Sequence, residues 1–167
     1  MAASGNSREL CDYKQKVIQQ ILQSETIIEA LQSECDPSEL LYNNIYPHGL
    51  IPGSTDEAKC YITVEVTMPQ VSTTNYFFKD VLLIITVICH VDMMRTDYGI
   101  PRTDYIAVEL DKLFNGNTSM GVGEMELVSN VESMYNERHS GRILRFQTQE
   151  TARNMCDEYG YYIGGLE

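Results

Sequence analysis

The chain has 167 residues, of which 43% are hydrophobic, and a net charge of −12. This composition predicts one folded domain with a core of its own and leaves too little chain for two ordinary domains. Lysine and arginine number 12 against 24 for aspartate and glutamate, without a dense basic cluster, so a site that grips nucleic acid is disfavoured. The longest apolar stretch, 81–91, is too short to cross a bilayer as a helix, and the first residues lack the pattern of a signal peptide.

The N-terminal third is predicted to be helical and then irregular. Residues 1–7 form a flexible lead, and apolar side chains recur at three, four and seven residues through 8–33, as on one face of a helix. Ser24 followed by Glu25 predicts a break that leaves a second, short helix. Residues 36–58 contain three of the five prolines but are too apolar for a free linker, so we expect an ordered loop excursion.

Residues 59–148 are predicted to form the sheet and helix core. Strict alternation of apolar and polar residues predicts a half-buried strand, and a run that is apolar on both faces predicts a central strand covered on both sides. Asn115 and Gly116 end a helix, since glycine accepts a left-handed cap. The expected segments are a strand over 60–68, a central strand over 76–92, a helix over 103–114, strands over 124–129 and 142–148, and a polar loop over 130–141.

The order of these segments predicts the fold class. We expect a single α+β domain over residues 1–167, with a mainly antiparallel sheet of about four strands. A long N-terminal helix and a second helix after the central strands flank the sheet. Residues 154–167 follow this core as a tail arm.

The five cysteines are widely spaced, and none forms a CxxC pair. An odd number of cysteines without a recognisable spacing predicts neither a disulfide framework nor a zinc site. We therefore expect small core or surface residues, and a reducing interior as the simplest compartment. The five residues are Cys11, Cys35, Cys60, Cys89 and Cys156.

Convergent catalytic groups are scarce, and the sequence assigns no catalytic, cofactor-binding or metal-binding residue. His90 and Asp92 share one strand face, because residues two apart point the same way. They are the centre of an alternative hypothesis, a small hydrolase-type enzyme that also uses the loop 95–102. A strand-end histidine that is satisfied by hydrogen bonds is the simpler interpretation of His90.

Tyrosine is the residue type that favours a protein interface here. Tyr159, Tyr161 and Tyr162 lie in the glycine-containing tail arm. One end of a tyrosine is apolar and the other forms hydrogen bonds, which suits a contact between subunits. These three residues are the candidate subunit-interface residues, in an arm that orders on a neighbouring subunit; a disordered tail is the alternative.

Several short segments between Glu57 and Phe146 resemble those of a known protein family. They are Ala58-Lys59-Cys60-Tyr61-Ile62, Asn75-Tyr76-Phe77-Phe78, Ile88-Cys89-His90, Gly99-Ile100-Pro101-Arg102-Thr103-Asp104, Leu113-Phe114-Asn115-Gly116 and Gly123-Glu124-Met125-Glu126-Leu127. This stretch resembles the neck and tail-completion proteins of tailed bacteriophages, particularly the tail-terminator type, in which an Arg-x-Asp opens a helix that packs on a small sheet.

The resemblance implies a structural role in a virion. The chain would form a ring, as a hexamer, that caps the tail tube protein and docks on the head-completion or connector protein. DNA would pass through the lumen without sticking, which the acidic charge allows. The resemblance implies no cofactor and no membrane contact, and it places the protein in the virion neck and, during assembly, in the host cytoplasm. An adaptor that adds a strand to a partner's sheet is a further alternative.

Overall fold

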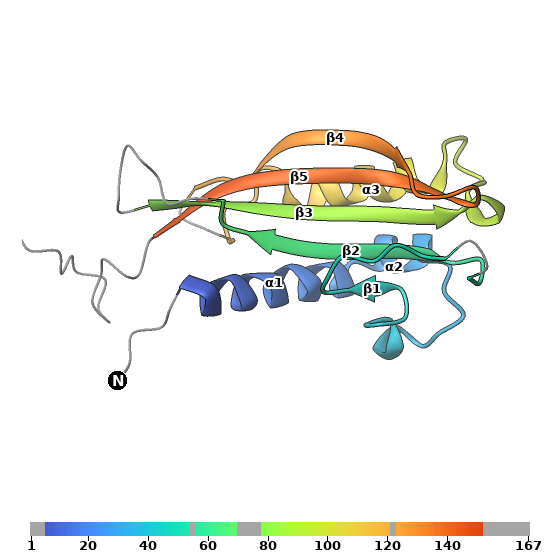
Figure 1. Ribbon diagram of the computed structural model, residues 1–167, viewed down its shortest axis with the longest axis horizontal. Helices are drawn as coiled ribbons and strands as arrows, with labels where there is room; N and C mark the ends of the chain where they lie inside the picture. Colours follow the sequence, from blue (N-terminus) through green and yellow to red (C-terminus); the bar gives the residue numbers. More distant parts are fainter. Residues whose placement is uncertain (1–5, 54–55, 70–77, 121–122, 152–167) are drawn as a thin grey trace, which may run out of the picture.

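The computed structural model describes residues 6–53, 56–69, 78–120 and 123–151. Within these ranges three α-helices cover one face of a five-stranded sheet (Figure 1), which confirms the expected α+β class. The strand order is β1-β2-β3-β5-β4, and every neighbouring pair is antiparallel except β1 and β2. The elements are α1 (Asn6–Gln23), α2 (Glu25–Leu31), η1 (Pro37–Glu39), β1 (Ile45–Tyr46), β2 (Cys60–Thr67), β3 (Phe78–His90), η2 (Val91–Met93), α3 (Arg102–Phe114), β4 (Glu126–Met134) and β5 (His139–Thr151).

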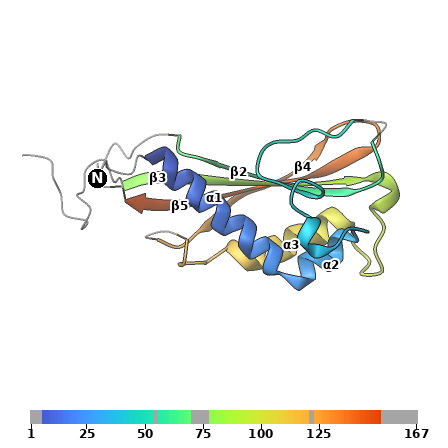
Figure 2. The same cartoon turned by 90° about the horizontal axis from the view of Figure 1, so that it is seen from below.

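The helices begin and end close to where the sequence predicts. Ser24 separates α1 from α2 because its backbone is extended, and α2 ends where Gln32 adopts a left-handed conformation. The three helices lie together on one side of the sheet (Figure 2), where Ile21, Ile27 and Phe114 are fully buried in a single core. No helix within the described residues has the length and apolarity that a membrane span requires.

The prediction that β3 is a central strand is confirmed, but its predicted cover on both sides is incomplete, because Leu82 and Ile84 on the second face are only half-buried. β3 lies between β2 and β5, and its odd-numbered residues from Val81 to Cys89 face the helices. On the other face Ile88 and His90 are also buried, although none of the described helices lies there. We call this second surface the helix-free face. Its buried end carries Tyr61 and Thr63 of β2, so the prediction that β2 is buried on one face only is wrong for its first half.

The last two strands are longer than the sequence predicts. Residues 130–134 and 139–141, expected as loop, belong to β4 and β5, which form a hairpin. The polar side chains of β4 hid this strand, because β4 lies at the edge of the sheet and is largely exposed. A β-bulge between Leu127 and Ser129 also shifts the alternation by one residue. The sequence also did not predict β1. This strand lies within residues 36–58, which were expected as a loop excursion, and it pairs with β2.

The connection from β3 to β4 crosses over β5. Both strands are antiparallel to β5 and therefore parallel to each other, and η2 and α3 lie in the connection between them. The ring of Phe114 on α3 packs edge-on against Phe146 of β5 at a centroid distance of 5.9 Å. This contact fixes the helix over the strand that its connection crosses.

The expectation that the chain holds no disulfide is wrong. Cys60 and Cys89 form a disulfide between β2 and β3. They are direct partners in the register of the two strands, with Cα atoms 4.2 Å apart, and both side chains lie in the core. Their wide separation in sequence hid the pair, because only the strand pairing brings them together. Cys11 is exposed and Cys35 half-buried, and neither is bonded.

Gly141 permits the close approach of β5 to β3. A Cβ atom at this position would lie 1.9 Å from the carbonyl oxygen of Val87, which is backbone and cannot rotate away. Gly141→Ala is therefore expected to lower the free energy of unfolding by about 1–3 kcal/mol, because the two central strands must separate. Urea denaturation measures the loss. Gly123→Ala, where a Cβ meets nothing within 4 Å, is the control and should leave the stability within about 0.5 kcal/mol.

Candidate subunit interface

Strand β4 is one free edge of the sheet within the described residues. It pairs with β5 on one side, so its remaining backbone N–H and C=O groups are available to a partner strand. Its nine residues expose three large apolar side chains, Val128, Val131 and Met134. Protein edges are normally protected by charge, proline or short length. A long edge with exposed apolar residues therefore points to an interaction surface.

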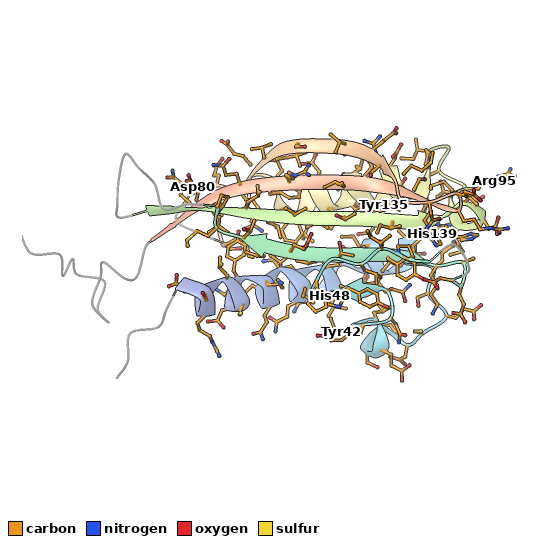
Figure 3. All side chains as sticks on the ribbon, in the orientation of Figure 1. Tyr42, His48, Asp80, Arg95, Tyr135 and His139 are labelled. Atoms are coloured by element: carbon orange, nitrogen blue, oxygen red, sulfur yellow. A yellow bond between two sulfur atoms is a disulfide. The ribbon has the colours of Figure 1, made fainter. Side chains whose placement is uncertain are left out.

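The opposite edge carries an aromatic surface. Leu41 and Tyr42, which we call the β1-side patch, precede β1 and are both exposed, with 60% of Tyr42 accessible. The Tyr42 ring lies 6.3 Å from that of Tyr46 in β1 and 6.2 Å from that of His48, between ring centroids. Figure 3 shows Tyr42 and His48 on the β1 side of the sheet. Tyr42 has a φ angle of 65°, which is strained for a bulky residue. This backbone conformation costs of the order of 1–3 kcal/mol, which the surrounding structure offsets while the ring stays at the surface.

Arg142 joins the β4 edge to α3. Its Nε atom donates a hydrogen bond to Asp104 of α3. Of its two terminal nitrogens, Nη1 donates to Asn130 and Nη2 donates to Glu132, both at 3.1 Å and both on β4. The hydrogen bond to Asp104 raises the pKa of Arg142. A groove of about 400 Å³ lies beside this network, with Met134 among its lining residues. The carboxylates that line it, Asp104 and Glu132, already bind Arg142, so the network positions the edge strand.

His90 and Asp92 form a local cap. The Nδ1 atom of His90 accepts a hydrogen bond from the backbone N–H of Asp92 at 3.2 Å, and the Asp92 carboxylate lies 3.5 Å from the same nitrogen. His90 is buried while Asp92 is exposed. The interpretation of His90 as a strand-end residue with a satisfied hydrogen bond is confirmed. Cys89 points to the other face, where it is bonded to Cys60.

The loop 95–102 ends in a buried arginine. The Arg102 guanidinium donates hydrogen bonds to the carbonyl oxygens of Met93 and Ala30 at 2.6 and 2.7 Å. It also binds the side chain of Gln32 and the carbonyl of Arg95. Burial lowers the pKa of Arg102. These hydrogen bonds join α2, the loop before α3 and α3 itself, and none of them is to a carboxylate.

The predicted interface tyrosines lie outside the described residues. Tyr159, Tyr161 and Tyr162 belong to 152–167, and their role stays a prediction. Sequence reasoning missed β4 as an edge and Tyr42 as an exposed ring. The apolar residues of β4 in an otherwise polar segment were the signal for the edge, whereas nothing in the sequence marked the φ angle of Tyr42. Within the described ranges no group of three or more histidine, cysteine, aspartate or glutamate residues could hold a metal ion.

Comparison with known proteins gives one family. The family model described as YomW matches residues 16–148, which include the C-terminal part of α1, all of α2 and α3, both sheet edges and most of β5. No curated protein and no solved structure matches the chain. The match covers well over half of the sequence. The chain therefore belongs to the YomW family.

Proposed function

We propose that the chain is a structural subunit of a tailed-phage particle, and that its copies close into a ring at the neck between head and tail. The ring would be a hexamer that terminates the tail tube and docks on the head-completion or connector protein. Membership of the YomW family supports a phage-associated protein. The role is non-catalytic and needs no cofactor, and it places the protein in the virion and, during assembly, in the host cytoplasm.

The observation that carries the proposal is the pair of unlike edges. A ring is built by heterologous contacts, in which one surface of each subunit binds a different surface of the next. The β4 edge and the β1-side patch lie at opposite ends of the strand order. Both expose apolar side chains, and only β4 offers a long row of unpaired backbone groups. Contact between the β4 edge of one copy and the β1-side patch of the next repeats in one direction, as a ring requires.

The negative net charge of the chain supports the proposal that DNA passes through the lumen of the ring. Each copy adds a net charge of −12, and phosphate is repelled by a surface of the same sign. DNA therefore passes through such a ring without binding to its wall.

The oligomeric state tests the proposal. Native mass spectrometry and light scattering over a wide concentration range should show a closed oligomer near six copies of the 19.0 kDa chain. Val131→Lys places a charge on the β4 edge and should reduce the oligomer at least tenfold in population. Val108→Lys on α3 is the matched control, since Val108 and Val131 are 46% and 45% exposed, and should leave the oligomer unchanged.

Mixing two defective variants tests the direction of the contact. Val131→Lys damages the β4 edge, and Tyr42→Lys damages the β1-side patch, so neither should form a ring alone. Mixed in equal amounts, they retain one intact contact and should form a heterodimer that grows no further. A two-fold contact between β4 edges would instead let Tyr42→Lys dimerise alone, and that result contradicts the ring.

The remaining outcomes favour the alternatives. A chain that stays monomeric up to the highest concentration reached, but whose β4 edge captures a strand from another protein, is the strand-adding adaptor. A catalytic activity that His90→Ala abolishes without changing the oligomer favours the hydrolase-type enzyme.

A further inference from the structure

Two histidines meet at one end of the helix-free face. His90 of β3 and His139 of β5 are direct partners in the strand register, and their ring centroids are 4.9 Å apart in an edge-to-face arrangement. Only 3% of His90 and 1% of His139 is exposed. His139 lies at the end of the sheet away from Asp80 (Figure 3). Histidines buried this deeply are neutral unless a partner stabilises their charge.

Hydrogen bonds fix where the protons of both rings lie. Asn136 donates through Nδ2 to the carbonyl of Pro52 at 2.8 Å, so its Oδ1 atom accepts from Nδ1–H of His139 at 3.1 Å. The proton of neutral His139 is therefore on Nδ1, and Nε2 is a bare acceptor that is buried without a hydrogen-bond partner among the described residues. In His90, Nδ1 accepts from the N–H of Asp92, so the proton is on Nε2.

The charges around His139 favour its neutral form. Burial is the largest cause that lowers the pKa of His139, followed by the neighbouring His90, while Asp56 acts weakly in the opposite direction. From β2 the ring of Tyr61 faces it at 6.3 Å, and burial raises the pKa of Tyr61, which keeps that phenol uncharged.

Other charged groups lie near the pair without balancing a proton on His139. The exposed Arg138 precedes it in sequence and adds a positive charge. The Asp92 carboxylate contacts His90 and not His139, and Glu57 is paired with Lys59 at 2.9 Å.

The same hydrogen bonds hold the segment 47–53 against the sheet. Asn136 connects His139 to the carbonyl of Pro52, whose side chain is buried. The other end of the segment is tied to α1 instead, because Lys14 donates a hydrogen bond to the carbonyl of Pro47 at 2.8 Å. A proton on Nε2 of His139 would need an acceptor, and no described residue supplies one. Because Nε2 of His139 is buried, it meets water only after the structure around it opens.

We propose that His90 and His139 form an acid-sensitive latch, which holds the segment 47–53 on the helix-free face while both rings are neutral and releases it when His139 takes a proton. The unfolded chain binds that proton near pH 6.5, the ordinary value for histidine. A histidine with a lowered pKa contributes stability that is present above this pH and is lost as the pH falls below it. Loss of negative charge towards the pI of 4.6 acts the other way, by reducing self-repulsion.

Nuclear magnetic resonance of the three histidines tests the latch in the full chain. We expect His139 to titrate below pH 6.5, the ordinary value for histidine, and to show the Nδ1–H tautomer, with His90 in the Nε2–H tautomer. Amide exchange in 47–53, corrected for its intrinsic pH dependence, should accelerate at least tenfold between about pH 7.5 and about pH 5.5.

A substitution that keeps the hydrogen bond isolates the titration. His139→Asn retains a donor to Asn136 but has no ring to protonate, so its urea midpoint should not fall between the same two pH values, whereas that of the unmodified chain should. The proposal is overturned if His139 titrates at or above pH 6.5, the ordinary value for histidine, or if the acid-induced loss persists in His139→Asn. Should that variant not fold, the titration and exchange of the unmodified chain decide the question.

Discussion

Replacing Arg102 with methionine is expected to lower the free energy of unfolding by about 3–5 kcal/mol. The guanidinium makes four hydrogen bonds, to the carbonyls of Met93, Ala30 and Arg95 and to the side chain of Gln32. Methionine fills a similar volume but donates nothing, so carbonyls beside the buried side chain lose their partner. The Ala30 carbonyl lies in the last turn of α2, where the helix itself supplies no donor.

Urea denaturation followed by circular dichroism measures this loss. Arg95→Met is the matched control: it removes an exposed arginine from the same loop and should change the stability by less than about 0.5 kcal/mol. Arg102→Lys keeps the charge but offers a compact ammonium in place of the planar fork, and should lie between the two. If Arg102→Met and Arg95→Met were equally stable, the proposed joining of α2 to α3 through Arg102 would be wrong.

Reduction of the disulfide between Cys60 and Cys89 is expected to lower the free energy of unfolding by about 3–4 kcal/mol. The bond closes a loop with a sequence separation of 29 residues and so restricts the unfolded chain. The comparison is between the oxidised chain and the same chain in a thiol-free reductant. Cys60→Ala combined with Cys89→Ala is the control, since its stability should not depend on the reductant.

Alkylation of the unfolded, unreduced chain provides an independent count. The sequence has five cysteines, so the bond predicts three alkylated thiols before reduction and five after it. Five labels before reduction would show that the bond does not form. Peptide mapping should locate the protected pair at the first residue of β2 and the penultimate residue of β3.

The elements that sequence reasoning located are those with a strong period. The apolar face of α1 and α2, the break at Ser24 and the doubly apolar β3 are set by local pattern, and the structure has them where they were expected. The end of β4 was not predicted, because an exposed edge strand has no buried face to impose alternation. β1 was not predicted either, because it is two residues long and exists only through its pairing with β2.

The contacts that sequence reasoning could not predict are non-local. Cys60 faces Cys89, and His90 faces His139, only after β2, β3 and β5 align, and no spacing in the sequence encodes either register. Composition showed that the chain is acidic and rich in tyrosine. Which ring is exposed depends instead on backbone conformation, as at Tyr42.

The placement of β5 between β3 and β4 has a consequence for synthesis. During translation β4 leaves the ribosome before the strand it pairs with, so a nascent chain that stops short of His139 holds two parallel strands with no partner between them. Sheets that need such distant pairings fold slowly, in milliseconds to seconds. The β4 edge is therefore complete only when β5 (His139–Thr151) lies between β3 and β4. Incomplete chains lack the surface by which we propose that copies join, so the order of the strands acts as a quality check that admits finished subunits alone.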